Sequence, residues 1–167
     1  MAPAENLDPV IAYAERDPKS IGHEETFAED LVEMVEIRRE LLALAVKVGR
    51  RLRQHDMEAR TVAVKVRYHD FTHVTRSITL STASADGEVL YQVGCTLLAE
   101  TMAGRKPMRL LGITGSNLLP AGQARPVSLF AQEDGREEKR RRINQAVDRI
   151  NETFGNGLIL PATLVKE

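Results

Sequence analysis

Short hydroxyl and cationic side chains gather in two neighbouring β-rich runs of the sequence. Thr75-Arg76-Ser77 lies in one run, and Lys65 and Arg67 lie in the run before it. Hydroxyls, guanidinium and ammonium groups and backbone amides are the donors that bind a nucleic-acid backbone. A merely solvated sheet face fits the same pattern equally well. Strict alternation places Arg76 on the apolar side of its run, so we expect a bulge or twist to re-aim it.

Three other groups of residues could do chemistry, and each has a plainer interpretation. His69-Asp70-x-x-His73 has a metal-compatible spacing, but it falls at a strand end and turn, which favours polar residues at a hairpin tip. Cys95 lies beside an apolar helical stripe with no assignable base, which indicates a small buried hydrophobe. Gly112-x-x-Gly115 lacks the Lys-Ser/Thr ending of a phosphate loop and indicates close backbone approach in a strand.

The length and composition are those of one compact domain with short appendages. The chain has 167 residues, of which 43% are hydrophobic and 28% charged. Its single cysteine cannot form an internal disulfide, and no apolar run reaches the ~18 residues of a membrane helix. The first thirty residues are acidic and lack the apolar stretch of a signal peptide. We therefore expect a cytoplasmic protein that does not contact membranes.

Charge is unevenly distributed along the chain, although the net charge is only −1. Residues 1–40 contain 4 Lys/Arg against 11 Asp/Glu, whereas residues 50–82 contain 7 against 3. Residues 104–127 contain 4 basic residues and no acidic ones. A nucleic-acid-binding surface needs local positive potential rather than a basic total. The distribution permits such a surface without proving it, because segregated charge is also typical of solvated helices.

Hydrophobic periodicity divides the chain into strands and helices. Val62, Val64 and Val66 alternate with polar residues, as in a half-buried strand. Apolar residues between Leu31 and Leu52 are instead spaced by three and four, as on one face of a helix. The same criteria predict strands at 20–27, 61–69, 73–82 and 108–118, and helices at 28–55 and 89–102.

The predicted order, β-α-β-β-α-β, indicates an α+β fold in which two helices pack on one face of a four-stranded sheet. The chain itself then leaves the opposite face uncovered, with Lys65, Arg67, Thr75, Ser77 and Thr114 on it. After residue 118 come a loop, a charged run and a third amphipathic helix that ends at Gly155. We therefore expect a linker at 1–19, a domain at 20–118, and a C-terminal extension with a helical tail at 119–167.

Five segments, in order along the chain, together resemble the little-finger domain of Y-family translesion DNA polymerases, in the bacterial DNA polymerase IV branch. The resemblance covers nearly the whole chain, and no single segment decides it. The segments are Lys19-Ser20-Ile21-Gly22-His23-Glu24-Glu25-Thr26-Phe27, Arg51-Leu52-Arg53 with Ala59-Arg60-Thr61-Val62, Lys65-Val66-Arg67-Tyr68 with Thr75-Arg76-Ser77-Ile78-Thr79-Leu80, Arg109-Leu110-Leu111-Gly112-Ile113, and Asp148-Arg149-Ile150-Asn151.

The resemblance implies a domain that lays its open sheet face into the DNA major groove and grips backbone phosphates of a primer–template duplex during damage bypass. Such contacts position DNA without reading its sequence, so binding should be sequence-tolerant and salt-sensitive. Carried over by position, the implied DNA contacts are Lys19, Ser20, Gly22, Lys65, Arg67, Thr75, Arg76 and Ser77.

The same resemblance implies that this chain does not polymerise DNA by itself. Polymerases use two metal ions held by carboxylates of the palm domain, and no match to the family's palm motifs is found here. We therefore expect Mg²⁺ in the palm and no cofactor in this chain, with the rest of the polymerase as a partner. The chain is then either an excised domain or a natural stand-alone piece.

Pro126-Val127-Ser128-Leu129-Phe130 resembles the sliding-clamp-binding peptide of this family, which usually reads Gln-Leu-x-Leu-Phe. Val127, Leu129 and Phe130 would enter a hydrophobic cleft of the clamp as an extended segment. Pro126 replaces the polar Gln anchor, so we expect weakened clamp binding. The alternative is that Leu129 and Phe130 cap the domain's own core.

Three functions remain open from sequence. The first, which we favour, is the DNA-gripping domain of a translesion polymerase. The second is an interaction module for the sliding clamp that does not grip DNA itself. The third is an unrelated small-ligand regulator with the same order of elements, since a fold does not fix a function. A closed pocket between the helices and the sheet would favour the third.

Overall fold

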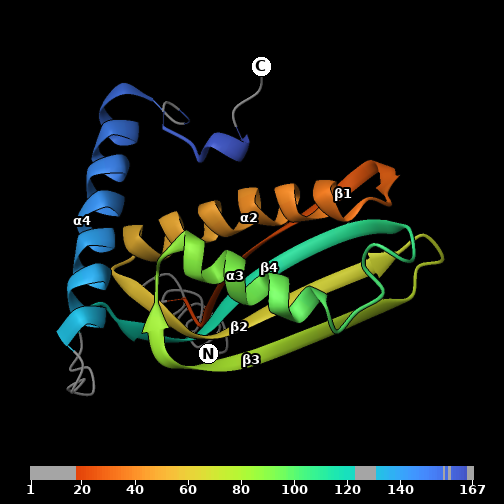
Figure 1. Cartoon of the computed structure of the whole chain (residues 1–167), viewed down its shortest axis with the longest axis horizontal. Helices are drawn as coiled ribbons and strands as arrows, with labels where there is room; N and C mark the ends of the chain where they lie inside the picture. The colour runs from red at the N-terminus through yellow and green to blue at the C-terminus, as the bar shows by residue number, and fades with distance from the viewer. Residues whose placement is uncertain (1–17, 123–130, 156, 158, 165–167) are drawn as a thin grey trace, which may run out of the picture.

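In a computed structural model of the chain, residues 18–122, 131–155, 157 and 159–164 are described. These described residues contain four strands and three α-helices, followed by a short 3₁₀ turn (Figure 1). These elements are β1 (Ser20–Leu31), α2 (Met34–Gln54), β2 (Met57–Tyr68), β3 (His73–Ser84), α3 (Gly87–Leu98), β4 (Met108–Pro120), α4 (Ala131–Phe154) and η1 (Ala162–Leu164).

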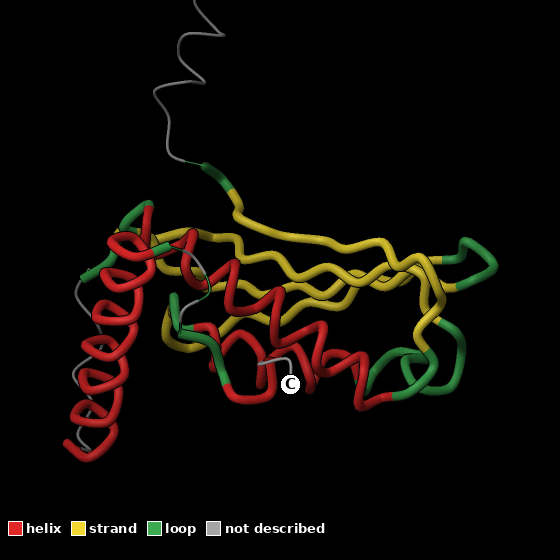
Figure 2. Tube along the Cα trace, turned by 90° about the horizontal axis from the view of Figure 1, so that it is seen from above, coloured by secondary structure: helices red, strands yellow, loops and turns green. Residues whose placement is uncertain are grey.

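The four strands form one antiparallel sheet in the order β1-β4-β2-β3. Helices α2 and α3 lie together on one face of this sheet, as Figure 2 shows. This arrangement confirms the predicted α+β fold and its β-α-β-β-α-β order. Among the described residues, no helix packs on the opposite face.

The core between helices and sheet follows from the two periodicities of the sequence. On β2, Val62, Val64 and Val66 are fully buried beneath the helices, while their neighbours along the strand point to the other face. On α2, Leu41 and Val48 lie on the stripe that packs against them. The α3 helix begins where the Asp86 side chain accepts a hydrogen bond from the Glu88 amide at 2.9 Å.

Several element boundaries differ from those predicted, and tertiary pairing explains the strands. β1 runs to Leu31, which pairs with Met108 on β4, so α2 begins at Met34 rather than at residue 28. β2 begins earlier and β4 ends later than predicted, because their pairing continues as far as Met57 and Pro120. α3 ends at Leu98 instead of reaching Met102. At that end the Thr101 hydroxyl donates to the Leu98 carbonyl at 2.6 Å.

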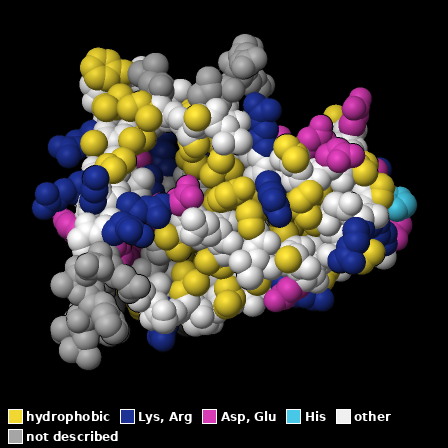
Figure 3. All heavy atoms as spheres, in the orientation of Figure 1, with side chains coloured by type: hydrophobic (Ala, Val, Ile, Leu, Met, Phe, Trp, Pro, Cys, Tyr) yellow, Lys and Arg dark blue, Asp and Glu magenta, His cyan; other side chains and the backbone are white. Residues whose placement is uncertain are grey.

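Helix α4 stands at one end of the sheet, beside the C-terminal end of α2 (Figure 1). It includes both the charged run and the third apolar stripe of the sequence. Figure 3 shows Lys and Arg side chains gathered over it. Within the described ranges, no helix is both long and apolar enough to cross a membrane.

Candidate functional site

The uncovered sheet face carries small and hydroxyl side chains in rows that run across all four strands. In one row Lys65 on β2 lies opposite Thr75 on β3 and Gly112 on β4. Glu24 on β1 pairs with that same Gly112, so the row ends in a carboxylate. Lys65 Nζ lies 3.6 Å from Glu24 Oε2, reaching over the glycine between them. Both side chains are well exposed, so this pair contributes little and leaves the lysine available to a ligand.

The two rows beyond Lys65, toward the α4 end, are made of small and hydroxyl residues. One contains Gly22, Thr114, Ala63 and Ser77. The other contains Ser20, Ser116, Thr61 and Thr79. In this second row the Thr61 and Thr79 hydroxyl oxygens lie 3.2 Å apart, and Asn117 Nδ2 donates to Thr61 Oγ1 at 2.7 Å. This part of the face therefore presents hydrogen-bond donors and acceptors on a flat surface with few long side chains.

Glycines keep part of this face flat because neighbouring strands leave them no room for a side chain. A Cβ at Gly112 would lie 3.0 Å from the Glu24 Cβ. A Cβ at Gly22 would collide with Thr114 Oγ1. A bulky ligand such as a nucleic-acid backbone can therefore approach the strands closely here.

Most of the sequence-predicted DNA contacts meet on this face. Lys65, Arg67, Thr75 and Ser77 share it by register, and Ser20 and Gly22 join them from β1 through β4. Lys19 is exposed directly before β1. The register thus collects residues that are up to 57 positions apart in the sequence into one surface.

Arg76 corrects the expectation of a bulge that would turn it onto the uncovered face. It pairs with Val64, and the β2–β3 register is continuous from Thr61 to Arg67. Arg76 therefore shares the side of the core residues, yet it stays exposed on the edge strand. Its guanidinium donates to the Thr75 carbonyl at 3.1 Å. It lies beside the uncovered face rather than on it.

The DNA contacts predicted from sequence do not include three hydroxyl residues of the face: Thr61, Thr79 and Ser116. Thr61 and Thr79 could have been found, because they continue the polar alternation of their strands. Ser116 depends on the pairing between β4 and β2, which the sequence does not reveal. The clamp-like residues Val127, Leu129 and Phe130, and Pro126 before them, lie outside the described residues.

The β2–β3 turn is a polar hairpin tip, as predicted for His69, Asp70 and His73. The Asp70 carboxylate accepts hydrogen bonds from Lys106 Nζ at 2.7 Å and from the Thr72 hydroxyl at 2.6 Å. These bonds hold the pKa of the Asp70 carboxyl well below its usual range. Asp70 is thus occupied in fixing the turn. Over the described residues, no group of three His, Cys, Asp or Glu side chains is placed to hold a metal ion.

Cys95 and His23 belong to the packing of the helices. Cys95 is half-buried on α3 and packs against the core, in agreement with its interpretation as a small hydrophobe. His23 on β1 lies beside Arg51 of α2, with 3.4 Å between Nε2 and Nη1. Burial, and then the nearby positive charges, lower the pKa of His23, so it adds no positive charge at neutral pH.

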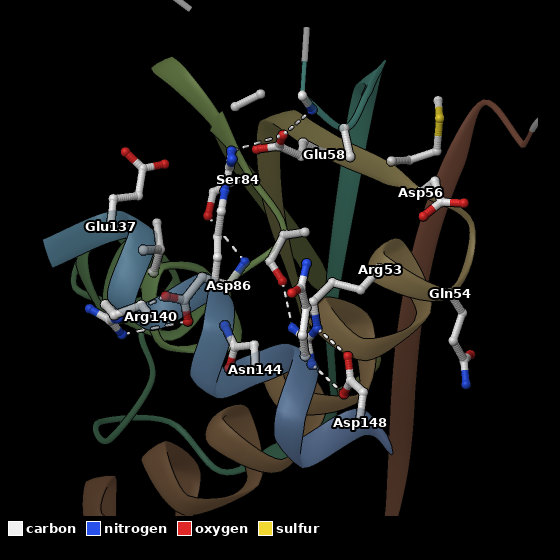
Figure 4. A pocket seen from close by; sticks show the side chains of 18 of the residues that line it. Arg53, Gln54, Asp56, Glu58, Ser84, Asp86, Glu137, Arg140, Asn144 and Asp148 are labelled. Carbon is white, nitrogen blue, oxygen red and sulfur yellow. Dashed lines mark hydrogen bonds and ion pairs between the residues drawn. The ribbon is translucent and has the colours of Figure 1, made fainter. Parts of the chain in front are cut away.

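A polar cleft separates α4 from the end of the sheet, and ion pairs bridge it (Figure 4). Arg53 of α2 binds the Asp148 carboxylate of α4 through two hydrogen bonds of 2.6 and 2.9 Å, and donates a third to the Ala85 carbonyl. Arg140 lies 2.8 Å from Asp86.

Arg141 completes this joint through Glu58 at 3.3 Å. Arg53, Arg140 and Arg141 are each matched by a carboxylate, so these pairs attach α4 to the body of the domain. The cleft lies at the end of the sheet, whereas the small-ligand alternative called for a closed pocket between the core helices and the sheet.

Comparisons with known proteins agree with this architecture. A model of the impB/mucB/samB family C-terminal domain matches residues 18–149. The chain is 41% identical over 149 residues to a DNA polymerase IV of Desulfatibacillum aliphaticivorans, covering 89% of this chain and 37% of that relative. It is 40% identical over 117 residues to a DNA polymerase IV of Halorhodospira halophila, covering 70% of this chain and 33% of that relative. The chain thus spans about a third of the length of these relatives.

A solved structure shares the fold. It is a complex of the beta-clamp processivity factor and the little finger domain of PolIV. The match has a TM-score of 0.51 and 23% sequence identity, and it covers 66% of this chain and 99% of that chain. The chain therefore belongs to the impB/mucB/samB C-terminal domain family, which confirms the little-finger resemblance of its sequence.

Proposed function

We propose that the uncovered sheet face grips the backbone of a primer–template duplex as part of a translesion DNA polymerase of the polymerase IV type. The observation that carries the proposal is the face itself. Lys65 and Arg67 project from a floor of serine, threonine and glycine residues that no helix of the chain's described part covers. The DNA polymerase IV relatives support the same assignment.

This face is suited to phosphates rather than to base edges. Its hydroxyls and cations can donate to phosphate oxygens at any sequence, and its flat floor lets the backbone approach. Neutralised phosphates release counterions, so the logarithm of the binding constant falls linearly with the logarithm of salt concentration. Binding should therefore be sequence-tolerant and steeply salt-dependent.

The Lys65→Ala variant tests the proposal. Because it removes one phosphate contact, the slope of log K against log salt should fall by about one, equally for unrelated DNA sequences. Fluorescence anisotropy of a labelled primer–template across a sodium chloride series measures this slope. Lys47→Ala is the matched control, since Lys47 is an exposed lysine on α2, on the other side of the sheet. An unchanged slope for Lys65→Ala, or equal losses for both variants, would contradict the proposal.

We infer a second function, sliding-clamp binding, from the clamp-like segment and from the solved complex of a PolIV little finger domain with the beta-clamp. In that segment Pro126 stands where the family has Gln. Restoring the polar anchor with Pro126→Gln should tighten binding to a purified sliding clamp several-fold, as measured by surface plasmon resonance. The double variant Leu129→Ala/Phe130→Ala should abolish binding, because it removes the apolar anchors. A clamp affinity that stays the same in both variants would refute this function.

A further inference from the structure

Phe71, at the tip of the β2–β3 turn, is an aromatic residue that the fold holds in solvent. Its side chain is 65% exposed. Its backbone has a φ of +68°, in the left-handed region that an aromatic residue rarely adopts. Glycine or asparagine would occupy this position with less strain. A strained, exposed aromatic residue points to a role in binding rather than in folding.

The turn holds Phe71 in this conformation through hydrogen bonds on both sides. The Phe71 amide donates to the Tyr68 carbonyl at 3.0 Å, and the Tyr68 amide donates to the Thr72 carbonyl at 2.9 Å. Asp70 joins the turn to Lys106, which follows α3. The ring is therefore presented on a fixed turn, which lowers the entropy lost when a ligand stacks on it.

One face of the Phe71 ring is backed by a cation. The Arg109 guanidinium carbon lies 4.8 Å from the ring centroid, and Arg109 Nε is 3.4 Å from Asp30 Oδ1. This contact fixes the ring from one side, and its large exposed fraction leaves the remaining ring surface to solvent. An aromatic ring with a free face and a cation behind it is the arrangement that stacks nucleobases.

The turn directly continues the proposed DNA-binding face. Arg67 pairs with His73 in the last row of that face before the turn. Lys106 and Arg109 lie at the same end of the sheet, each paired with a carboxylate, Asp70 and Asp30 respectively. In Figure 1 the turn joining β2 to β3 projects beyond the end of the sheet opposite α4.

We propose that Phe71, backed by Arg109, stacks on an unpaired nucleobase of the strand that extends beyond the gripped duplex. Bases inside a duplex are already stacked, so only an unpaired base offers a free face to the ring. The inference rests on the proposed function, because the sheet face must place the DNA end near the turn. It adds a contact specific for a single-stranded overhang.

The Phe71→Trp variant provides a direct probe, because the chain contains no tryptophan. A primer–template with a single-stranded overhang should quench this tryptophan, whereas a blunt duplex of the same paired sequence should leave its emission unchanged. Phe71→Leu, which keeps apolar bulk without a π-face, should weaken overhang binding about tenfold and leave blunt-duplex binding unchanged. Phe154→Leu is the control, since Phe154 is another largely exposed aromatic residue, on α4.

Comparing the overhang DNA with the blunt duplex separates this inference from the proposed function. Anisotropy of the blunt duplex reports the sheet-face grip alone. If the blunt duplex binds but Phe71→Leu binds both DNAs like the unmodified chain, stacking is refuted and the grip stands. Equal quenching by both DNAs would also refute stacking on an unpaired base. If neither DNA binds at low salt, both proposals fail together.

Discussion

The Asp148→Ala variant should release α4 from the body of the domain. Asp148 accepts two hydrogen bonds from Arg53, in a pair whose side chains are only 12% and 19% exposed. Removing the carboxylate leaves a largely buried guanidinium without its partner, which costs about 2–3 kcal/mol in a part-buried setting. Because α4 is joined to the body by such pairs, this loss should appear as local opening rather than as global unfolding.

Hydrogen exchange measured by mass spectrometry checks this result. Amides of residues 140–154 should exchange roughly thirtyfold faster in Asp148→Ala, as a loss of about 2 kcal/mol implies, while β2 and α2 keep their protection. Glu138→Ala is the control, because Glu138 pairs with Arg142 on the exposed side of α4 and should change exchange little. Unchanged exchange in Asp148→Ala would mean that other contacts hold α4.

Two polar side chains, one on α2 and one on α4, each have a buried atom that is not hydrogen-bonded. Asn151 Oδ1 and Arg50 Nε are buried without a hydrogen-bond partner, one helical turn from Asp148 and Arg53 respectively. Each buried group of this kind costs free energy that the Arg53–Asp148 pair must offset.

The layers of the fold could be predicted from sequence because they rest on local periodicity. Val62, Val64 and Val66 alternate at period two, and Leu41 and Val48 lie on a stripe of helical period, so each element indicated its own buried face. The boundary of β1 could not be predicted in this way. Leu31 fits the helical stripe of α2, but its pairing with Met108, far along the chain, keeps it in the strand.

The candidate site likewise contains some residues that local alternation predicts and others that only long-range pairing brings in. Lys65, Arg67, Thr75 and Ser77 lie on two strands joined by a short turn, so their common face follows from alternation alone. Ser116 and Gly112 enter the face through β4, whose place in the centre of the sheet is a long-range choice. Arg53 and Asp148 are 95 positions apart, and nothing local in either segment indicates the other.

The β2–β3 turn contains one residue whose role could be predicted from sequence and one whose conformation could not. Asp70 indicated a turn from sequence, because its carboxylate can bond to backbone and hydroxyl groups two residues on, as it does with Thr72. The left-handed conformation and exposure of Phe71 could not be predicted in the same way. Aromatic residues usually avoid both a positive φ and full exposure to solvent. Sequence preferences therefore predict a buried ring on an ordinary backbone conformation.

The Gly49→Ala variant should destabilise the domain, although alanine is the better helix former. α2 and α3 approach each other at Gly49 and Gly87, and a Cβ at Gly49 would lie 2.9 Å from the Gly87 amide nitrogen and 3.1 Å from the Ala85 carbonyl oxygen. Backbone atoms cannot rotate away, so the helices must separate and loosen the core around Val48. Such overpacking costs about 1–3 kcal/mol, more than the ~1 kcal/mol that alanine contributes through helix propensity.

Urea unfolding of a matched pair of variants separates these two terms. Gly135 lies in α4 with no atom near its missing Cβ, so Gly135→Ala gains propensity without a clash and should keep or slightly raise the stability of α4. Gly49→Ala should lower the unfolding midpoint with the slope unchanged. A midpoint raised by Gly49→Ala would show that α2 and α3 can move apart at no cost. In that case Gly49 and Gly87 would not set the spacing of the two helices beneath the sheet.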